Sequence, residues 1–281
     1  MSNRVISSRL LEDFWARLRA EERAQSTIEK YQRDILSFCR YLEGQAVSKE
    51  KAVCWKERLL RAGLSPATIN AKLSAVNGLF RFLGWEDCRL RFFRVQRRLF
   101  RQPEKELTQQ EYRRLTKAAR ASGQLRLELL MQALCATGVR VSELRYLTVE
   151  AAKRGRADIA LKGKIRTILL PRKLCRKLLQ YAQERQIVSG EIFLTKSGTS
   201  LSRRQIWREM KSLCRAAEVE ASKVFPHNLR HLFAIVFYQN FNDIVRLADV
   251  LGHSSIDTTR IYLLTGGDEL ARQIERLKLV T

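Results

Sequence analysis

The sequence is poor in several features that mark particular classes of protein. It has only three histidines and four prolines, and its six cysteines never form a C-x-x-C pair. The clustered spacing of a structural zinc site is therefore missing, and we expect the cysteines to be small buried apolar residues in a reducing compartment. No run reaches the ~18 apolar residues of a spanning helix, and the polar start predicts no secretory signal.

Acidic residues are scarce relative to basic ones. Lys and Arg number 53 against 29 Asp and Glu, which gives a formal net charge of +24. A charge of this size indicates an anionic partner and says nothing about the fold. The phosphate backbone of nucleic acid is the first candidate, and an anionic membrane surface is the alternative. Hydrophobic residues make up 45% of the chain, enough to fill real cores, and the length suits two domains.

The N-terminal part is predicted to be a small helical bundle. Apolar residues recur at helical spacing through residues 7–43, and one helix is predicted to begin at Ser26, with Glu29 completing a capping box. A further helix is expected over 48–62. Another should begin at Pro66, because proline is favoured in the first helical position.

The C-terminal part combines helices with one short hairpin. Thr108 and Glu111 stand in capping-box register at the start of the first helix. β-prone residues then predict two strands joined near Lys162. The expected elements are helices over 108–121, 125–137 and 141–147, strands over 157–161 and 165–170, and helices from 172 onward.

Four short motifs in the C-terminal part carry residues suited to a single reaction. They are Thr137–Leu144 with Arg140, His227-Asn228-Leu229-Arg230, Leu251-Gly252-His253, and Tyr262. Attack on a phosphodiester builds negative charge on its oxygens, which metal ions or fixed cationic groups can stabilise. No carboxylate cluster for a metal is evident, whereas guanidinium groups fit phosphate oxygens. The motifs therefore favour phosphoryl transfer without a metal.

The nucleophile in that reaction would be a phenol. A tyrosine with apolar neighbours is more often a core residue, but Tyr262 follows the Gly252-His253 turn by nine positions. Because a phenol has a pKa of about 10, it needs a positive field and a proton acceptor. His227 and Arg230 lie three apart on a helix opened by Pro226, so both share one face. His231 adds a His-x-x-x-His spacing, but an arginine between the histidines would repel a metal ion.

In their order and separation, these motifs resemble those of the tyrosine recombinases, the phage integrase family. The resemblance covers about residues 107–265, and more loosely the helical bundle resembles the family's SAM-like core-binding domain. It implies a mainly α protein with a small β-hairpin. The expected parts are a DNA-clamping domain over 1–95, a basic linker over 96–106, a catalytic domain over 107–265, and a tail helix over 266–281 that docks into a neighbouring protomer.

The resemblance also implies a role for each motif residue. Arg140 and Arg230 would hold the phosphodiester, and His227 and His253 would stabilise it and move protons. Tyr262 would form a 3′-phosphotyrosyl bond. Lys162, at the hairpin tip, would protonate the leaving 5′ oxygen, with Lys164 as the alternative. The expected supporting residues are Glu143, which braces the site, and His231, a structural neighbour; Asn228 replaces an aspartate that is common in the family.

The implied partner is double-stranded DNA with inverted-repeat core sites, bound by a homotetramer on two sites. Neither a cofactor, a metal nor a membrane is expected, and a cytoplasmic, nucleoid-associated location follows. The basic linker is either a solvated tether or a phosphate contact. The predicted DNA-binding residues are Arg94, Arg97, Arg98, Arg101, Lys164 and Arg166.

Several functional alternatives stay open. A type IB topoisomerase would use a similar tyrosine, and a non-catalytic DNA-binding factor could share the fold. With no further N-terminal module expected, a compact recombinase of the Xer or DNA-inversion type is favoured. The sequence does not identify the DNA site, helper proteins, or the choice among integration, excision, inversion and dimer resolution.

Overall fold

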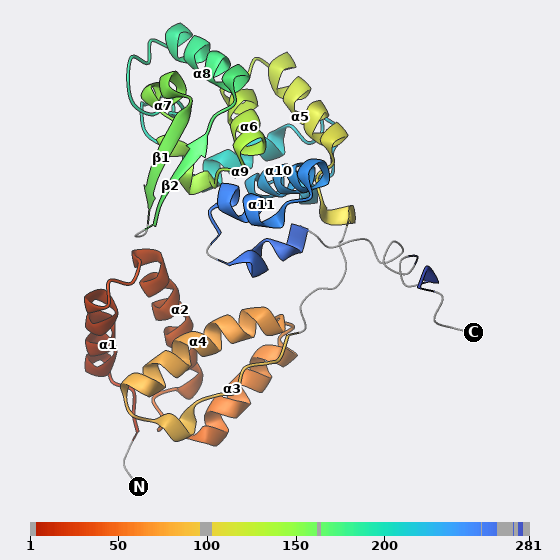
Figure 1. Cartoon of the computed structure of the whole chain (residues 1–281). Helices are drawn as coiled ribbons and strands as arrows, with labels where there is room; N and C mark the ends of the chain where they lie inside the picture. Colours follow the sequence, from red (N-terminus) through yellow and green to blue (C-terminus); the bar gives the residue numbers. More distant parts are fainter. Residues whose placement is uncertain are drawn as a thin grey trace. The chain divides into compact units, whose positions relative to one another are not determined.

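Two compact units make up the chain, residues 1–97 and residues 98–281 (Figure 1). They are seen in a computed structural model. The residues that it describes are 4–95, 103–161, 164–253, 255–262, 272 and 275–277.

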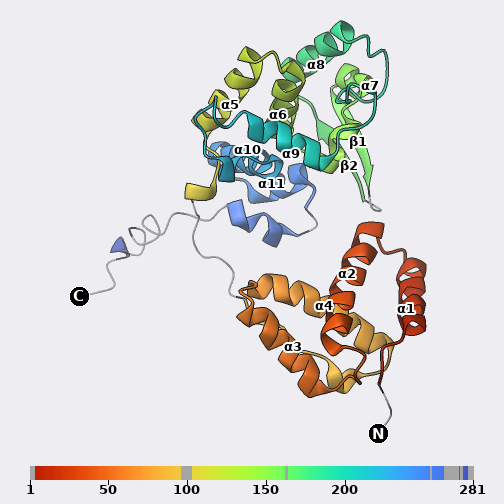
Figure 2. The ribbon, with the colours of Figure 1, turned by 180° about the vertical axis from the view of Figure 1, so that it is seen from behind.

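The first unit is a bundle of four α-helices followed by one short 3-10 helix, η1 (Figure 2). Phe38, Trp55 and Phe80 meet at its centre, where the Phe38 ring lies 5.0 Å from Trp55 and 5.8 Å from Phe80. Burial of such aromatic rings is the main force that holds a bundle of this size together. The elements are α1 (Ser8–Ala20), α2 (Gln25–Leu42), α3 (Lys49–Arg61), α4 (Pro66–Phe82) and η1 (Glu86–Cys88).

Of two helix starts predicted in this unit, one is confirmed and the other is wrong. Pro66 does open α4, with the Ser65 hydroxyl accepting a hydrogen bond from the backbone of Thr68. The predicted capping box at Ser26 is wrong, because α2 begins one residue earlier and its N-cap, Ala24, makes no side-chain hydrogen bond. Ser26 therefore lies inside the first turn, and tertiary packing of the helix outweighs its local capping signal.

Two asparagines of α4 hold the chain segment that leaves the bundle. Asn77 donates to the carbonyl of Leu90 and accepts from its N–H, both at 2.8 Å. Asn70 makes the same pair of bonds with Phe93, again at 2.8 Å. Each side-chain amide thus bonds both the N–H and the carbonyl of one residue, as a neighbouring strand would. These bonds satisfy backbone groups that lie outside any helix or sheet.

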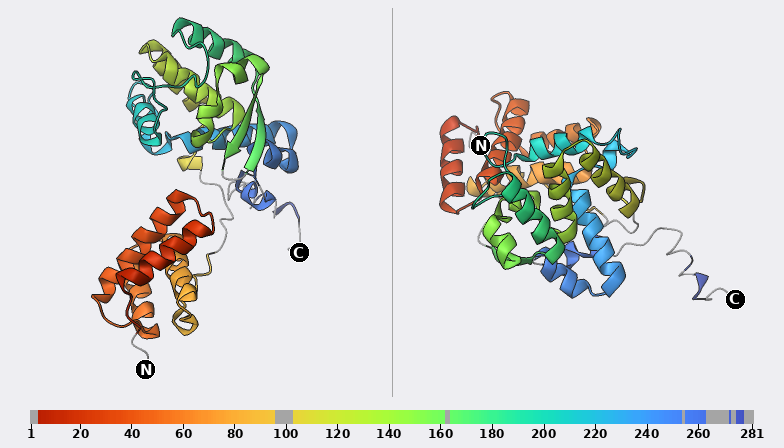
Figure 3. Two further views of the ribbon diagram at one scale, coloured as in Figure 1. Left: turned by 90° about the vertical axis from the view of Figure 1, so that its left-hand side faces the viewer. Right: turned by 90° about the horizontal axis from the view of Figure 1, so that it is seen from above.

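The second unit places one two-stranded sheet among helices (Figure 3). Its core gathers residues from α5 to α10 and from both strands. The α-helices are α5 (Gln109–Ala121), α6 (Leu125–Thr137), α7 (Val149–Arg154), α8 (Arg172–Glu184), α9 (Arg203–Ser212), α10 (Pro226–Phe241) and α11 (Ile244–Leu251). The strands are β1 (Arg156–Leu161) and β2 (Lys164–Leu169), and the 3-10 helices are η2 (Pro103–Lys105), η3 (Val141–Tyr146), η4 (Ala221–Lys223), η5 (Ile256–Thr258) and η6 (Arg260–Tyr262).

The elements predicted over residues 108–186 are confirmed, whereas most of the predicted tail helix lies outside the described residues. The capping box of α5 forms as expected between Thr108 and Glu111. β1 and β2 pair antiparallel, with Leu161 opposite Lys164 at the tip. The helix predicted after Arg140 is a 3-10 helix, and at its start Glu143 accepts the backbone N–H of Arg140.

The cysteines are less uniformly buried than predicted. Cys88, Cys175 and Cys214 are buried and Cys39 and Cys135 half-buried, but Cys54 is exposed on α3. No helix within the described residues is long and apolar enough to cross a membrane.

Replacement of Asn77 by alanine tests the role of the asparagine pairs. The N–H and carbonyl of buried Leu90 would lose their partners, so we expect a loss of about 2 kcal/mol in the free energy of unfolding. Three of the four tryptophans, Trp15, Trp55 and Trp85, lie in this unit, and the fourth, Trp207, is exposed on α9, so the tryptophan fluorescence change on urea unfolding reports mainly on this unit. Arg33→Ala, on an exposed position of α2, serves as the control. A loss below about 0.5 kcal/mol for Asn77→Ala would contradict the account.

Candidate active site

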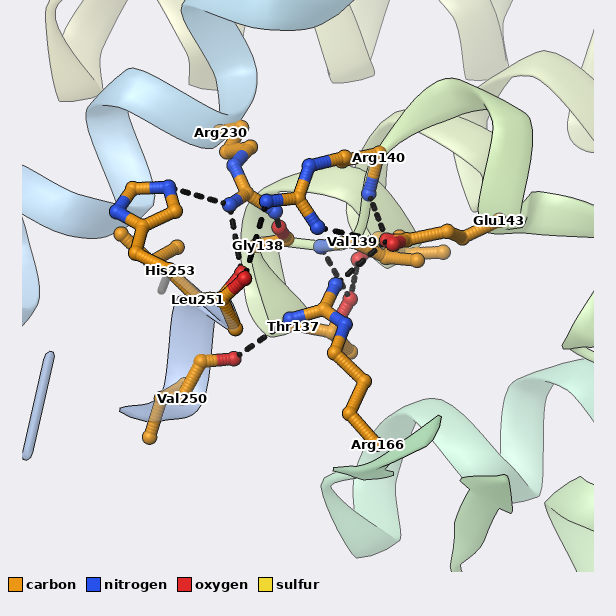
Figure 4. A network of polar contacts seen from close by, with 12 residues as sticks. Thr137, Gly138, Val139, Arg140, Glu143, Arg166, Arg230, Val250, Leu251 and His253 are labelled. Atoms are coloured by element: carbon orange, nitrogen blue, oxygen red, sulfur yellow. Dashed lines mark hydrogen bonds and ion pairs between the residues drawn. The ribbon is translucent and has the colours of Figure 1, made fainter. Parts of the chain in front are cut away.

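A buried arginine stands at the centre of the candidate site. Arg230 on α10 is only 3% exposed, and its guanidinium donates to the carbonyls of Gly138 and Leu251, the latter at 2.8 Å (Figure 4). Its Nη2 also lies 2.9 Å from Nε2 of His253. One side chain therefore joins three segments that are far apart in the sequence.

Glycine is required where α6 ends, beside this arginine. Gly138 adopts a left-handed φ of +62°, which favours glycine over other residues. A Cβ there would lie 2.6 Å from the Phe233 ring and 2.9 Å from Leu251. The Gly138 backbone therefore packs directly against α10 and α11, and this close approach brings its carbonyl to Arg230.

Arg140 lies beside Arg230 and is held by a carboxylate. Glu143 accepts from the backbone N–H of Arg140 at 2.8 Å and from its Nη1 at 3.0 Å. Arg166 from β2 donates to the same carboxylate at 2.5 Å. Burial acts to raise the pKa of Glu143, but these hydrogen bonds and the charge of Arg166 outweigh it and leave the pKa below its ordinary value. Glu143 is therefore ionised at neutral pH.

The neighbouring arginines charge the site before any substrate arrives. Desolvation and then the charge of Arg140 lower the pKa of Arg230 to about 10, still well above neutral pH. The two guanidinium groups lie next to each other (Figure 4). An anion between them would relieve their repulsion, so the geometry favours binding of a phosphate group.

His253 is held as a neutral ring with one tautomer. Since Arg230 can only donate, Nε2 of His253 accepts, which leaves the ring proton on Nδ1 for the Thr259 hydroxyl at 2.9 Å. Desolvation, followed by the charges of Arg230 and Arg140, lowers the pKa of His253 to about 4. The ring is thus uncharged at neutral pH and is aimed by the Gly252 turn.

Tyr262 lies in the same pocket but is buried. Its ring is 6.3 Å from that of His253 and 4.9 Å from that of His231, and it packs with Ala234 and Leu247. Desolvation raises its pKa, while the charges of Arg230 and Arg140 act in the opposite direction. The phenol is therefore protonated at rest, and this largely buried side chain must become accessible before its oxygen can attack a phosphodiester.

The remaining motif residues surround the start of α10. The side chain of His227 is exposed, and partial desolvation and the positive charges around it lower its pKa. His231 instead faces Glu106, with 3.3 Å between Nε2 and Oε1. Asn228 donates to the carbonyls of Lys105 and Lys223 at 2.9 and 2.8 Å. This amide thus fixes the helix start to the segment that enters the unit.

Several predicted site residues cannot be placed. Lys162, the expected general acid, lies outside the described residues, as do Arg97, Arg98 and Arg101 of the linker and most of the expected tail helix. Lys164 is described only as part of β2, and Arg94 is exposed in the first unit. Among the described residues, no group of three or more metal-ligating side chains comes together.

Sequence reasoning missed two contacts and misjudged the setting of one residue. Thr259 is fully buried and bonds His253, and nothing in the sequence distinguishes it from the neighbouring Thr258. Glu106, within the predicted linker, pairs with His231. Arg166, predicted to contact DNA, has a side chain only 14% exposed and is paired with Glu143.

The pKa of His253 predicts a pH dependence of stability. It is about 4 in the folded chain and about 6.5 when unfolded, so the unfolded state binds more protons between these values. Stability should therefore fall as pH drops from about 6.5 to about 4. His253→Gln should reduce this slope, measured as urea unfolding free energy at several pH values. An equal slope in the variant and the parent would contradict the assignment.

Comparison with known proteins agrees with this geometry. The phage integrase family matches residues 105–265, and the N-terminal SAM-like domain of phage integrases matches residues 11–87. Tyrosine recombinase XerA of Pyrococcus furiosus is 30% identical, with 100% of this chain and 98% of the relative covered.

Solved structures show the same fold. XerH recombinase bound to its difH substrate has a TM-score of 0.69 at 20% identity and covers 98% of this chain and 90% of its own. A lambda integrase tetramer bound to a Holliday junction gives 0.71 at 19% identity, covering 90% of this chain and 76% of its own. The chain therefore belongs to the phage integrase family, the tyrosine recombinases, and carries that family's catalytic domain.

Proposed function

We propose that this tyrosine recombinase is a site-specific enzyme that cleaves and rejoins DNA through a 3′-phosphotyrosyl bond on Tyr262. The observation that carries the proposal is the convergence of Arg140, Arg230, His253 and Tyr262 in one pocket. The pocket holds three guanidinium groups, those of Arg140, Arg166 and Arg230, and one carboxylate, that of Glu143, which pairs with Arg140 and Arg166. The pocket thus keeps a positive excess of two charges, which suits a phosphodiester.

In the proposed reaction, the Tyr262 oxygen attacks phosphorus and the bond to the 5′ oxygen breaks. Arg140 and Arg230 bind the non-bridging oxygens, whose charge grows in the transition state. The phenol gives its proton to a histidine. His227 is the candidate acceptor, because its lowered pKa leaves it uncharged at neutral pH, whereas Nε2 of His253 already accepts a hydrogen bond from Arg230. Lys162 protonates the leaving oxygen, with Lys164 as the alternative.

The phosphotyrosyl bond conserves the energy of the broken phosphodiester, which strand exchange then uses. The freed 5′-hydroxyl attacks the phosphotyrosine of a partner protomer, and two successive exchanges pass through a Holliday junction. A homotetramer on two inverted-repeat sites would carry this out, by analogy with the lambda integrase tetramer bound to a Holliday junction. We further propose that the 1–95 bundle and the basic 96–106 linker clamp the duplex and that the 266–281 tail joins protomers.

A trapping experiment tests the nucleophile. Duplexes of randomised sequence, each nicked so that the short fragment diffuses away after cleavage, should yield covalent protein–DNA adducts that survive detergent. Tyr262→Phe lacks the attacking oxygen, so its yield should drop to background. Mass spectrometry should place the DNA on Tyr262, and sequencing the retained strands should identify the site.

The controls separate the proposed recombinase from other activities. An adduct on another tyrosine, or none from the parent protein, would contradict the proposal. Relaxation of supercoiled plasmid without joining of two sites would instead indicate a topoisomerase activity.

A sulfur substitution tests the general acid. Lys162→Ala should slow cleavage of ordinary DNA by about 10²–10⁴-fold, the usual contribution of acid catalysis. A substrate with sulfur in place of the 5′ bridging oxygen needs no proton on leaving, so the variant should cleave it nearly as fast as the parent. Lys164→Ala is the matched variant. If Lys164→Ala shows the loss and the rescue, the acid is Lys164, and if neither does, the hairpin supplies none.

A further inference from the structure

Arg166 ties the β1–β2 hairpin to two other segments of the pocket. It leaves β2 with only 14% of its side chain exposed. Its Nη2 donates to Glu143 at 2.5 Å and its Nη1 to the carbonyl of Val250 at 3.1 Å (Figure 4). An arginine that served only as a surface contact for DNA would point its guanidinium outward, so these contacts indicate a role inside the site.

The turn that carries His253 is shaped around this side chain. Gly252 has a φ of +62°, and a Cβ there would lie 2.6 Å from Nη1 of Arg166 and 3.0 Å from its Nε. The Gly252 carbonyl also accepts from Nη2 of Arg140 at 3.3 Å. The absence of a side chain at this position thus lets Arg166 reach the turn.

The ion pair between Arg166 and Glu143 affects how much positive charge Arg140 presents. Glu143 is 3% exposed and holds Arg140 by two hydrogen bonds. A buried carboxylate that orients a phosphate-binding arginine also cancels much of its charge, and the cancellation is strong where water is excluded. Arg166, on the other side of the same carboxylate, supplies the opposite charge.

We propose that Arg166 is a positioning residue that offsets the charge of Glu143 and fixes the hairpin to the Gly252 turn, so that Glu143 orients Arg140 without weakening the positive field on the phosphate. The proposal rests on the proposed function, since it concerns the same phosphodiester. It also joins the strand that follows Lys162 to the residues that bind phosphate. The charge of Arg166 also affects other residues of the pocket. Desolvation and the other arginines lower the pKa values of Arg230 and His253 most, and Arg166 adds a smaller effect in the same direction.

A double-mutant cycle of Arg166→Gln and Glu143→Gln tests the offset. Each single change should slow cleavage of pre-bound DNA by about tenfold or more, because one removes positive charge and the other frees Arg140. The double variant restores the original balance of charge, so its loss should be at least about fivefold smaller than the product of the two single losses. Losses that simply multiply would overturn the proposal.

Three further measurements exclude simpler explanations. Arg166→Gln should leave DNA affinity within about twofold of the parent, whereas weaker binding with unchanged cleavage of bound DNA would show a phosphate contact instead. Arg166→Lys, which keeps the positive charge, should slow cleavage of bound DNA less than Arg166→Gln does. Arg176→Gln, an exposed position on α8, controls for net charge.

A readout independent of cleavage separates this proposal from the proposed function. NMR titration of the full chain should show the pKa of His253 rising in Arg166→Gln, because a nearby positive charge is gone. An unchanged His253 pKa would overturn the charge role even if the enzyme cleaves DNA. If the parent forms no covalent adduct while the His253 pKa shifts as expected, the proposed function fails and the electrostatic role of Arg166 stands.

Discussion

The burial of the Arg230 guanidinium is the constraint on which the candidate site depends. A buried cation is tolerated only when its donors are satisfied, and here the carbonyls of Gly138 and Leu251 and the ring of His253 satisfy them. These partners come from the end of α6, the end of α11 and the turn beyond it. The need to satisfy one side chain therefore assembles three distant motifs into one pocket. The same bonds select the neutral tautomer of His253.

Electrostatic balance is the second theme of the pocket. Adjacent arginines repel each other, and the protein maintains this arrangement by orienting Arg140 with a buried carboxylate. Glu143 would neutralise the charge of Arg140, the residue that it orients, if Arg166 did not pair with the same carboxylate. The resting site is thus preorganised and positively charged, and binding an anion is favourable because the groups need little rearrangement. Tyr262 is the exception, since its side chain is largely buried and its ring packs with apolar residues of α10 and α11.

The sequence predicts some parts of this account much better than others. Helices, the hairpin and the residues of the pocket follow from apolar periodicity and from motif residues whose chemistry is specific, and Arg140, Arg230 and His253 do meet. Local signals fail where tertiary contacts dominate. The Ser26 cap is displaced by packing of α2. The roles of Thr259 and Arg166 were not predictable, because each depends on which distant atom its side chain meets.

The charge of the arginines can be tested directly with DNA that carries a methyl group in place of one non-bridging oxygen at the scissile phosphate. This change removes the negative charge that Arg230 is proposed to bind. Cleavage rates of the parent and Arg230→Ala should be compared on normal and methylated DNA. We expect the variant to lose at least about 10²-fold on the normal phosphodiester and far less on the uncharged one. An equal loss on both substrates would contradict the claim that this pocket works by stabilising charge on the phosphate.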